Sequence, residues 1–262
     1  MTRIAAILLA LSVACHAVDV DLGMIDDITW NLVGSEYVAV FGGGAPVIDP
    51  DLKLWWMFDT NEGTNALDST TNSNNGNLVG GAFWTNEVGG CVYLDGANDE
   101  VASRATAILN AVTNFTVTCW IKTFSIGLGD GIMSTKGTQT AGLKAHGATA
   151  ARFNLVTSSG AVGTGKISPG NWTFISGVYT QNSTYGYWAH SWYTGTTFQV
   201  SNTVYNWTAV KTHIVDDVWR LGNDEGGKFI GARFKDVRLY ARPLSTAELS
   251  GIVTSTKATY GY

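Results

Sequence analysis

A short loop in the first third of the chain carries residues that could bind a metal ion. From Asp68 to Gly76 the sequence reads Asp-Ser-Thr-Thr-Asn-Ser-Asn-Asn-Gly, which places a carboxylate close to several amide side chains. Calcium takes about six to eight oxygen ligands of these kinds, together with backbone carbonyls. The same residues also favour Asx turns. The loop therefore predicts either a calcium site or a polar loop held by its own hydrogen bonds.

Aromatic residues suggest a second kind of chemistry. The chain has 10 tryptophans, a large number for its length. Candidates for ligand binding lie in or beside the expected loops: Trp84, Trp188, Trp192, Tyr193 and Trp207. Flat aromatic faces suit the apolar faces of carbohydrate rings, and neighbouring amide side chains could bind the hydroxyl groups. The alternative is that these rings simply pack in the fold.

The residue patterns do not favour catalysis. Glycoside hydrolysis needs two carboxyl groups held roughly 5–9.5 Å apart. The acidic pairs Asp26-Asp27, Asp216-Asp217 and Asp224-Glu225 are adjacent, so on a strand their members would face opposite ways. The histidines lack the spacing of metal ligands, and no Gly-x-Ser-x-Gly motif occurs. We therefore expect a protein that is not an enzyme.

The N-terminus reads as a secretory signal peptide over residues 1–17. Arg3 precedes an apolar run from Ile4 to Val13, and small residues suited to cleavage follow as far as Ala17. Lipid attachment at Cys15 is a second interpretation. No later stretch reads as a transmembrane helix, and the net charge of −5 without a basic stripe excludes nucleic acid as a partner.

Two cysteines remain after the signal peptide, Cys91 and Cys119. An exported chain meets an oxidising compartment, where these residues could form a disulfide. The alternative is two separate thiols, because the distance between the cysteines cannot be derived from their positions in the chain.

The elements that must position these residues are mostly strands. Residues 18–51 form an extension or linker in which 28–32 and 37–41 could be edge strands. From residue 52 to 262, short apolar runs recur at roughly 8–12 residue spacing with turns between them, which indicates a sandwich or barrel. In the run from Phe115 to Lys122 the side chains alternate between two faces. Only 245–253 reads as a helix, with Ser245 as N-cap and Glu248 three residues later.

Six segments, in order along the chain, resemble laminin-G-like domains of the concanavalin-A-like lectin/glucanase superfamily. They are Trp55 to Asp59, Asp68 to Gly76, Tyr93 to Val101, Phe115 to Lys122, Trp172 to Tyr179 and Phe234 to Ser245. The resemblance covers about residues 52 to 253. It implies an all-β, two-sheet antiparallel jelly-roll sandwich with one short C-terminal helix. Related glucanases carry a Glu-x-Asp-x-x-Glu or Glu-x-Asp-x-Glu strand, and this sequence has none.

The resemblance also implies a ligand set for the metal. Asp68, an amide oxygen from Asn72 or Asn75, and Asp236 of the closing strand would converge on one Ca²⁺. The replacement of two of the family's glycines by Thr71 and Ser73 counts against that site.

Three functional hypotheses follow, because this fold hosts several functions. The first is a secreted, non-catalytic module that binds a glycan or an extracellular protein and serves carbohydrate binding or adhesion. The second is a structural or assembly subunit of an extracellular layer or filament, which self-associates when residues 18–50 add a strand to a neighbouring copy. The third is a polysaccharide hydrolase or lyase.

Overall fold

The computed structural model divides the chain into two compact units, Met1–Ile48 and Asp49–Tyr262. It describes residues 28–33, 36–41, 49–59, 62–109, 112, 114–135, 141–145, 150–155, 165–181, 186–193, 198–205, 218–224 and 227–262. The predicted signal peptide and Cys15 lie outside these ranges. Among the described residues, no helix has the length and apolar character needed to cross a membrane.

The first unit contains an antiparallel pair of strands. Strand β1 spans Ile28–Val33 and β2 spans Glu36–Phe41, in the two runs that the sequence predicts as strands. The second unit begins at Asp49, near the predicted start of the main domain at residue 52.

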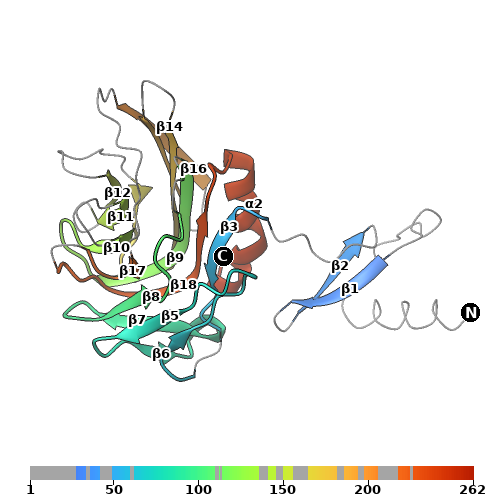
Figure 1. The fold of residues 1–262 in the computed structure, drawn as a ribbon, viewed down its shortest axis with the longest axis horizontal. Coiled ribbons are helices and arrows are strands. Elements are labelled where there is room, and N and C mark those ends of the chain that lie inside the picture. The colour runs from blue at the N-terminus through green and yellow to red at the C-terminus, as the bar shows by residue number, and fades with distance from the viewer. Residues whose placement is uncertain are drawn as a thin grey trace, which may run out of the picture. The chain divides into compact units, whose positions relative to one another are not determined.

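The second unit is a sandwich of two antiparallel sheets (Figure 1). One sheet, called here the helix-side sheet, has the order β16-β15-β14-β9-β18-β7-β6, and β3 also pairs with β18. Its strands are β3 (Leu52–Trp56), β6 (Phe83–Thr85), β7 (Cys91–Asp95), β9 (Phe115–Ser125), β14 (Thr173–Gln181), β15 (Gly186–Tyr193), β16 (Phe198–Tyr205) and β18 (Gly231–Tyr240).

The other sheet, called here the opposite sheet, has the order β13-β12-β11-β10-β17-β8-β5-β4. Its strands are β4 (Asn65–Ala66), β5 (Gly76–Val79), β8 (Glu100–Ser103), β10 (Gly131–Thr135), β11 (Ala141–Ala145), β12 (Ala150–Leu155), β13 (Gly165–Lys166) and β17 (Trp219–Leu221).

The core between the sheets follows from alternation along the strands. On β9 the side chains of Phe115, Val117, Cys119 and Ile121 join the main hydrophobic core, whereas Trp120 belongs to a second cluster. This confirms the two faces predicted for the run. Both faces of the strand are buried because the helix-side sheet is covered on its outer side as well.

A short helix covers part of the outer face of the helix-side sheet. Helix α2 (Thr246–Thr256) has Ser245 as N-cap in a capping box with Glu248, as predicted, and the 3₁₀ helix η3 (Lys257–Tyr260) continues it. Leu249 and Val253 are the buried residues of α2. They pack into the second cluster, together with Trp120 and other aromatic side chains.

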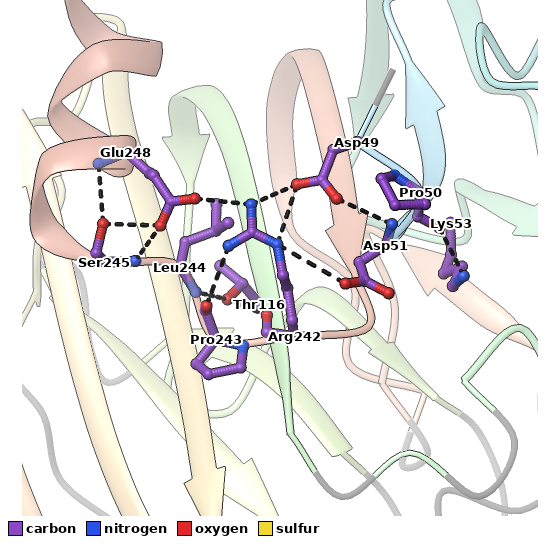
Figure 2. Close-up of polar contacts among 10 residues, drawn as sticks. All are labelled: Asp49, Pro50, Asp51, Lys53, Thr116, Arg242, Pro243, Leu244, Ser245 and Glu248. Carbon is purple, nitrogen blue, oxygen red and sulfur yellow. Dashed lines mark hydrogen bonds and ion pairs between the residues drawn. The ribbon is translucent and has the colours of Figure 1, made fainter. Parts of the chain in front are cut away.

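Arg242 holds the start of the second unit to this helix (Figure 2). Its guanidinium forms ion pairs with Asp49 and, at 2.7 Å, with Glu248 Oε1. Asp51 lies 3.9 Å from the same guanidinium. The chain before β3, the end of β18 and the first turn of α2 therefore meet at one side chain.

Candidate functional site

The oxygen-rich loop 68–76 is held by its own hydrogen bonds. Asp68 Oδ1 accepts the backbone N–H groups of Trp55 at 2.9 Å and Thr70 at 3.0 Å. Asp68 Oδ2 accepts hydrogen bonds from the Thr70 hydroxyl at 2.7 Å and from the backbone N–H of Asn74 at 2.8 Å. These four bonds match the roughly four acceptor positions of a carboxylate.

The loop's amide groups bind the loop to β3 and to itself. Asn72 Nδ2 donates to the carbonyl oxygens of Leu52 and Lys53 at 3.0 and 3.2 Å. Asn75 Oδ1 accepts the backbone N–H of Asp68 at 2.8 Å. The side chains predicted as metal ligands thus stabilise the turn that connects β4 to β5.

Asp236 lies in a bulge of β18 and is paired with a cation. Its φ of 52° is in the left-handed region, and the pairing with β9 shifts between Lys235 and Arg238. The carboxylate accepts a hydrogen bond from the Trp55 indole N–H at 2.7 Å. It accepts two more from Arg238, from Nε at 2.7 Å and from Nη2 at 3.0 Å. Burial lowers the pKa of Arg238, but the charge of Asp236 outweighs it and raises that pKa overall.

These four side chains do not fit a calcium ion in the arrangement observed. Asp68 and Asp236 both contact Trp55, but one binds its backbone N–H and the other its indole N–H. Asp236 is neutralised by Arg238 rather than available to a metal. The described part of the chain contains no group of three or more His, Cys, Asp or Glu side chains that could hold a metal ion. Calcium binding stays a prediction, which a titration tests below.

Two of the aromatic side chains predicted to bind a ligand, Trp84 and Tyr193, pack against other residues. Trp84 packs against the main core 5.8 Å from the Phe58 ring, and its indole N–H donates to Gly63 O at 2.8 Å. Tyr193 is buried in the second cluster, edge-on to Trp120. Both rings are thus used in packing, and a ligand-binding role for the two residues stays a prediction.

The other predicted aromatic residues are placed only in part. Trp188 and Trp192 lie within β15, opposite Thr203 and Gln199 of β16, and not in loops. Trp207 lies outside the described residues.

The two cysteines are separate, buried thiols. Strands β7 and β9 flank β18, where Phe234 is opposite both Val92 and Ile121 in the main core. Cys119, two residues before Ile121, faces that core, whereas Cys91, next to Val92, belongs to the second cluster. The cysteines therefore lie on opposite faces of the sheet, and the disulfide considered from the sequence is not present. Burial raises the pKa of both thiols.

Another aromatic surface, which was not predicted from the sequence, is exposed on the helix-side sheet. Phe83 of β6, Tyr93 of β7 and Phe124 of β9 form a row, with ring centroids 4.8 Å apart for the first pair and 5.0 Å apart for the second. Phe83 is 51% exposed and Phe124 46%. Arg233 of β18 lies over the Tyr93 and Phe124 rings, with its Cζ 5.2 and 5.9 Å from their centroids. We call Phe83, Tyr93, Phe124 and Arg233 the aromatic row.

Sheet register brings this row together. Phe83 is opposite Tyr93, Tyr93 is opposite Arg233, and Arg233 is opposite Lys122. Directly paired residues share one face of a sheet, so the row runs across the strands. Alternation within 83–85 and 91–95 could have predicted an outward Phe83 and Tyr93, but only the strand order makes them neighbours.

Charged groups border the row. Glu87 lies in the 3₁₀ helix η2 (Glu87–Gly89) between β6 and β7; it pairs with Lys122 Nζ at 2.6 Å and Arg233 Nε at 3.2 Å. It also accepts Trp172 Nε1 at 3.1 Å. Partial burial raises the pKa of Glu87, but the hydrogen bond and charge of Lys122, with the charge of Arg233, hold it below its ordinary value.

A second set of charges is buried on the opposite sheet. Glu100 pairs with Arg220 and accepts Asn223 Nδ2 at 2.6 Å. Lys144 and Asp224 form an ion pair at 3.3 Å, with both side chains less than a tenth exposed. Each of these carboxylates is neutralised by a cation.

Comparison with solved structures finds several proteins that share this fold. Domain 4 of AbnA, an extracellular arabinanase from Geobacillus stearothermophilus solved with arabinotriose, superposes with a TM-score of 0.59 at 13% identity; the match covers 77% of this chain and 97% of that domain. Trypanosoma rangeli sialidase gives 0.58 at 16% identity over 82% of this chain, but this chain spans only 34% of the sialidase.

A third similar structure is the binding domain of botulinum neurotoxin DC in complex with SialylT. Its TM-score is 0.54 at 13% identity, and the match covers 79% of this chain and 52% of that one. Identities this low establish a shared fold and nothing about ligands.

Sequence comparison gives the family. A search of curated protein sequences found no significant match. A laminin-G-type family model does match residues 95–250, more than half of the chain, from the turn that ends β7 to helix α2. With a sandwich of two antiparallel sheets around one core, the chain belongs to the concanavalin A-like lectin/glucanases superfamily.

Proposed function

We propose that this protein is a secreted, non-catalytic carbohydrate-binding module and that it binds its glycan on the aromatic row. The observation that carries the proposal is the exposure of Phe83 and Phe124 on either side of Tyr93. Exposed large aromatic rings on a soluble domain mark interaction sites when they are contiguous. The predicted signal peptide supports secretion.

The polar groups around the row suit a sugar. Glu87, Lys122 and Arg233 are each partly exposed and already held by ion pairs, so they can exchange hydrogen bonds with hydroxyl groups while keeping their positions. The arabinanase domain and the toxin domain were solved with saccharide ligands. Their shared fold makes a glycan a natural ligand class to test.

The state of Glu87 supports a non-catalytic role for the aromatic row. Glycosidases need a carboxylic acid with a raised pKa to protonate the leaving group. The pKa of Glu87 is instead lowered by Lys122 and Arg233, so the group stays ionised at neutral pH. Asp95, the last residue of β7, uses Oδ1 to accept the backbone N–H of Ala97 at 2.7 Å.

The test is glycan binding by the mature protein, followed by calorimetry with any glycan retained. We expect Phe83→Ala and Phe124→Ala each to weaken binding by up to about tenfold, because an aromatic contact contributes roughly 0.5–1.5 kcal/mol and 1.4 kcal/mol corresponds to tenfold. Leu67→Ala is the matched control, because Leu67 is 51% exposed and lies outside the aromatic row. Binding that survives both phenylalanine substitutions, or falls equally with Leu67→Ala, would exclude the aromatic row as the site.

An assembly role is the second candidate, and the β1–β2 pair favours it. This sheet contains only those two strands among the described residues, and an isolated two-stranded hairpin is marginally stable in water. Its edges could pair with a strand of another copy. Size-exclusion chromatography with and without residues 18–48 tests this, and a monomer in both cases would reject it.

Reducing-sugar release by the same preparations tests the hydrolase alternative.

A further inference from the structure

The charges around the aromatic row balance one another. Lys122 and Arg233 are positive, and Glu87, which pairs with both, is negative. Asp95 supplies a second negative charge: it is exposed, lies two residues after Tyr93, and is opposite Gly231 of β18. Alternation along β7 places Asp95 on the same face as Tyr93. The surface next to the exposed rings therefore has no excess of either sign among these residues.

The two cations are also already engaged. Lys122 Nζ lies 2.6 Å from Glu87 Oε1. Arg233 forms an ion pair with Glu87 and also lies over two aromatic rings. A carboxylate or sulfate on a ligand would have to displace Glu87 from these partners. It would also approach Glu87 and Asp95, and like charges at short range repel.

The row is longer than one aromatic ring. It steps from β6 to β7 to β9 with centroid distances of 4.8 and 5.0 Å, and its two ends are the exposed residues. Tyr93 in the middle is only partly exposed. A ligand that contacts both Phe83 and Phe124 must therefore extend across the strands.

We infer that the ligand is an uncharged saccharide chain of more than one sugar, lying along the aromatic row across β6, β7, β18 and β9. This inference rests on the proposed function and specifies its ligand class. Hydrogen bonding of sugar hydroxyls to groups that are already paired keeps the charges neutralised. Binding should therefore depend weakly on salt, whereas exposed charge–charge attraction is screened within about 10 Å at 0.1 M salt.

The experiment compares glycans by isothermal titration calorimetry at low and high salt. The neutral probes are gluco-, xylo-, manno- and arabino-oligosaccharides from one to six sugars, and the acidic probes are oligogalacturonate, sialyllactose and a sulfated oligosaccharide. We expect binding to at least one neutral series, with affinity rising from one sugar to the longer chains and changing little with salt. Phe83→Ala should reduce the gain with chain length.

The decisive variant is Glu87→Gln, which removes the charge that neutralises Lys122 and Arg233. We expect it to gain at least a few-fold in affinity for the acidic probes at low salt, and to lose that gain at high salt. Glu248→Gln is the matched control, because it converts a glutamate that is also paired with an arginine, on α2 rather than beside the row. It should leave all binding unchanged.

The outcomes distinguish a wrong ligand class from a wrong proposed function. Wild-type protein that binds acidic probes more tightly than neutral ones, with affinity that falls as salt rises, would overturn the uncharged ligand while leaving carbohydrate binding in place. Affinity that does not change with chain length would overturn the extended ligand. Absence of binding to every probe would overturn the proposed function itself.

Discussion

Phe124 lies against Gly231. A Cβ atom on Gly231 would come within 2.9 Å of Phe124 Cε2 and 2.7 Å of Ser125 Cβ. Because Gly231 of β18 has no side chain, the Phe124 ring has the space to stack on Tyr93, at an interplanar angle of 13°. An exposed phenylalanine is thus positioned by a glycine far from it in the sequence.

Gly231→Ala should weaken glycan binding although it removes no binding group. The new methyl must displace Phe124 or Ser125, and overpacking of this kind costs about 1–3 kcal/mol of stability. Calorimetry and urea unfolding measure the two effects. Gly251→Ala is the control, because a Cβ there meets nothing within 4 Å. That control should stabilise α2 by up to about 1 kcal/mol and leave binding intact. Unchanged binding in Gly231→Ala would show that the position of Phe124 does not matter.

The pairing of Arg242 with Glu248 should make part of the stability sensitive to acid. Hydrogen bonds from Arg242 and then Ser245 lower the pKa of Glu248 from 4.5 to about 2. Because the folded-state pKa is the lower one, the stabilisation is complete above about pH 4.5 and is lost as the pH falls toward 2. The Glu248 side chain is 42% exposed, so screening limits the pair to at most about 1 kcal/mol.

Urea unfolding of wild type and Glu248→Gln between pH 7 and pH 2 measures this contribution. The difference between the two proteins should be largest near neutral pH and should disappear near pH 2. Arg242→Gln, combined with Glu248→Gln in a double-mutant cycle, controls for losses unrelated to the pair. A difference that stays constant across the pH range would mean that Glu248 stabilises α2 only as part of the cap.

The C-terminal residues should be essential for the outer face of the helix-side sheet. Tyr260 stacks on Trp120 at a centroid distance of 4.0 Å and an interplanar angle of 18°, and both rings are buried. Tyr260→Ala leaves a cavity, and removal of a buried aromatic side chain costs about 3–5 kcal/mol. Urea unfolding followed by tryptophan fluorescence should show this loss.

Tyr260→Phe is the control for that experiment, because it keeps the ring on Trp120 and should lose much less stability than Tyr260→Ala. Equal losses in the two variants would assign the effect to the hydroxyl group rather than to stacking.

Asp68 should stabilise the loop 68–76 without a metal. Asp68→Ala leaves the N–H groups of Trp55, Thr70 and Asn74 without their acceptor. The loss should be at least about 1–3 kcal/mol, which is the cost of one unsatisfied polar group. Thermal unfolding should show this loss equally in calcium and in EDTA. A melting temperature that calcium raises, EDTA lowers and Asp68→Ala makes insensitive would instead establish the metal site predicted from the sequence.

The sequence by itself determined the elements whose signals are local. The alternation from Phe115 to Ile121 predicted both faces of β9, because neighbouring side chains on a strand point to opposite sides. Ser245 and Glu248 predicted the start of α2, because the capping box uses only residues three apart. For the loop 68–76 the sequence left two predictions open, a calcium site or a polar loop, because its residues both supply oxygen ligands and favour Asx turns.

Only the tertiary structure decided which residues meet across the sheet. Phe83, Tyr93, Arg233 and Phe124 come from four strands, and their proximity depends on the order β9-β18-β7-β6 and on its register. Strand order is set by the packing of the whole core, and a shift of one residue moves a strand's side chains to the other face. For that reason the sequence could not place Cys91 and Cys119 on opposite faces, bury Tyr193, or predict the aromatic row.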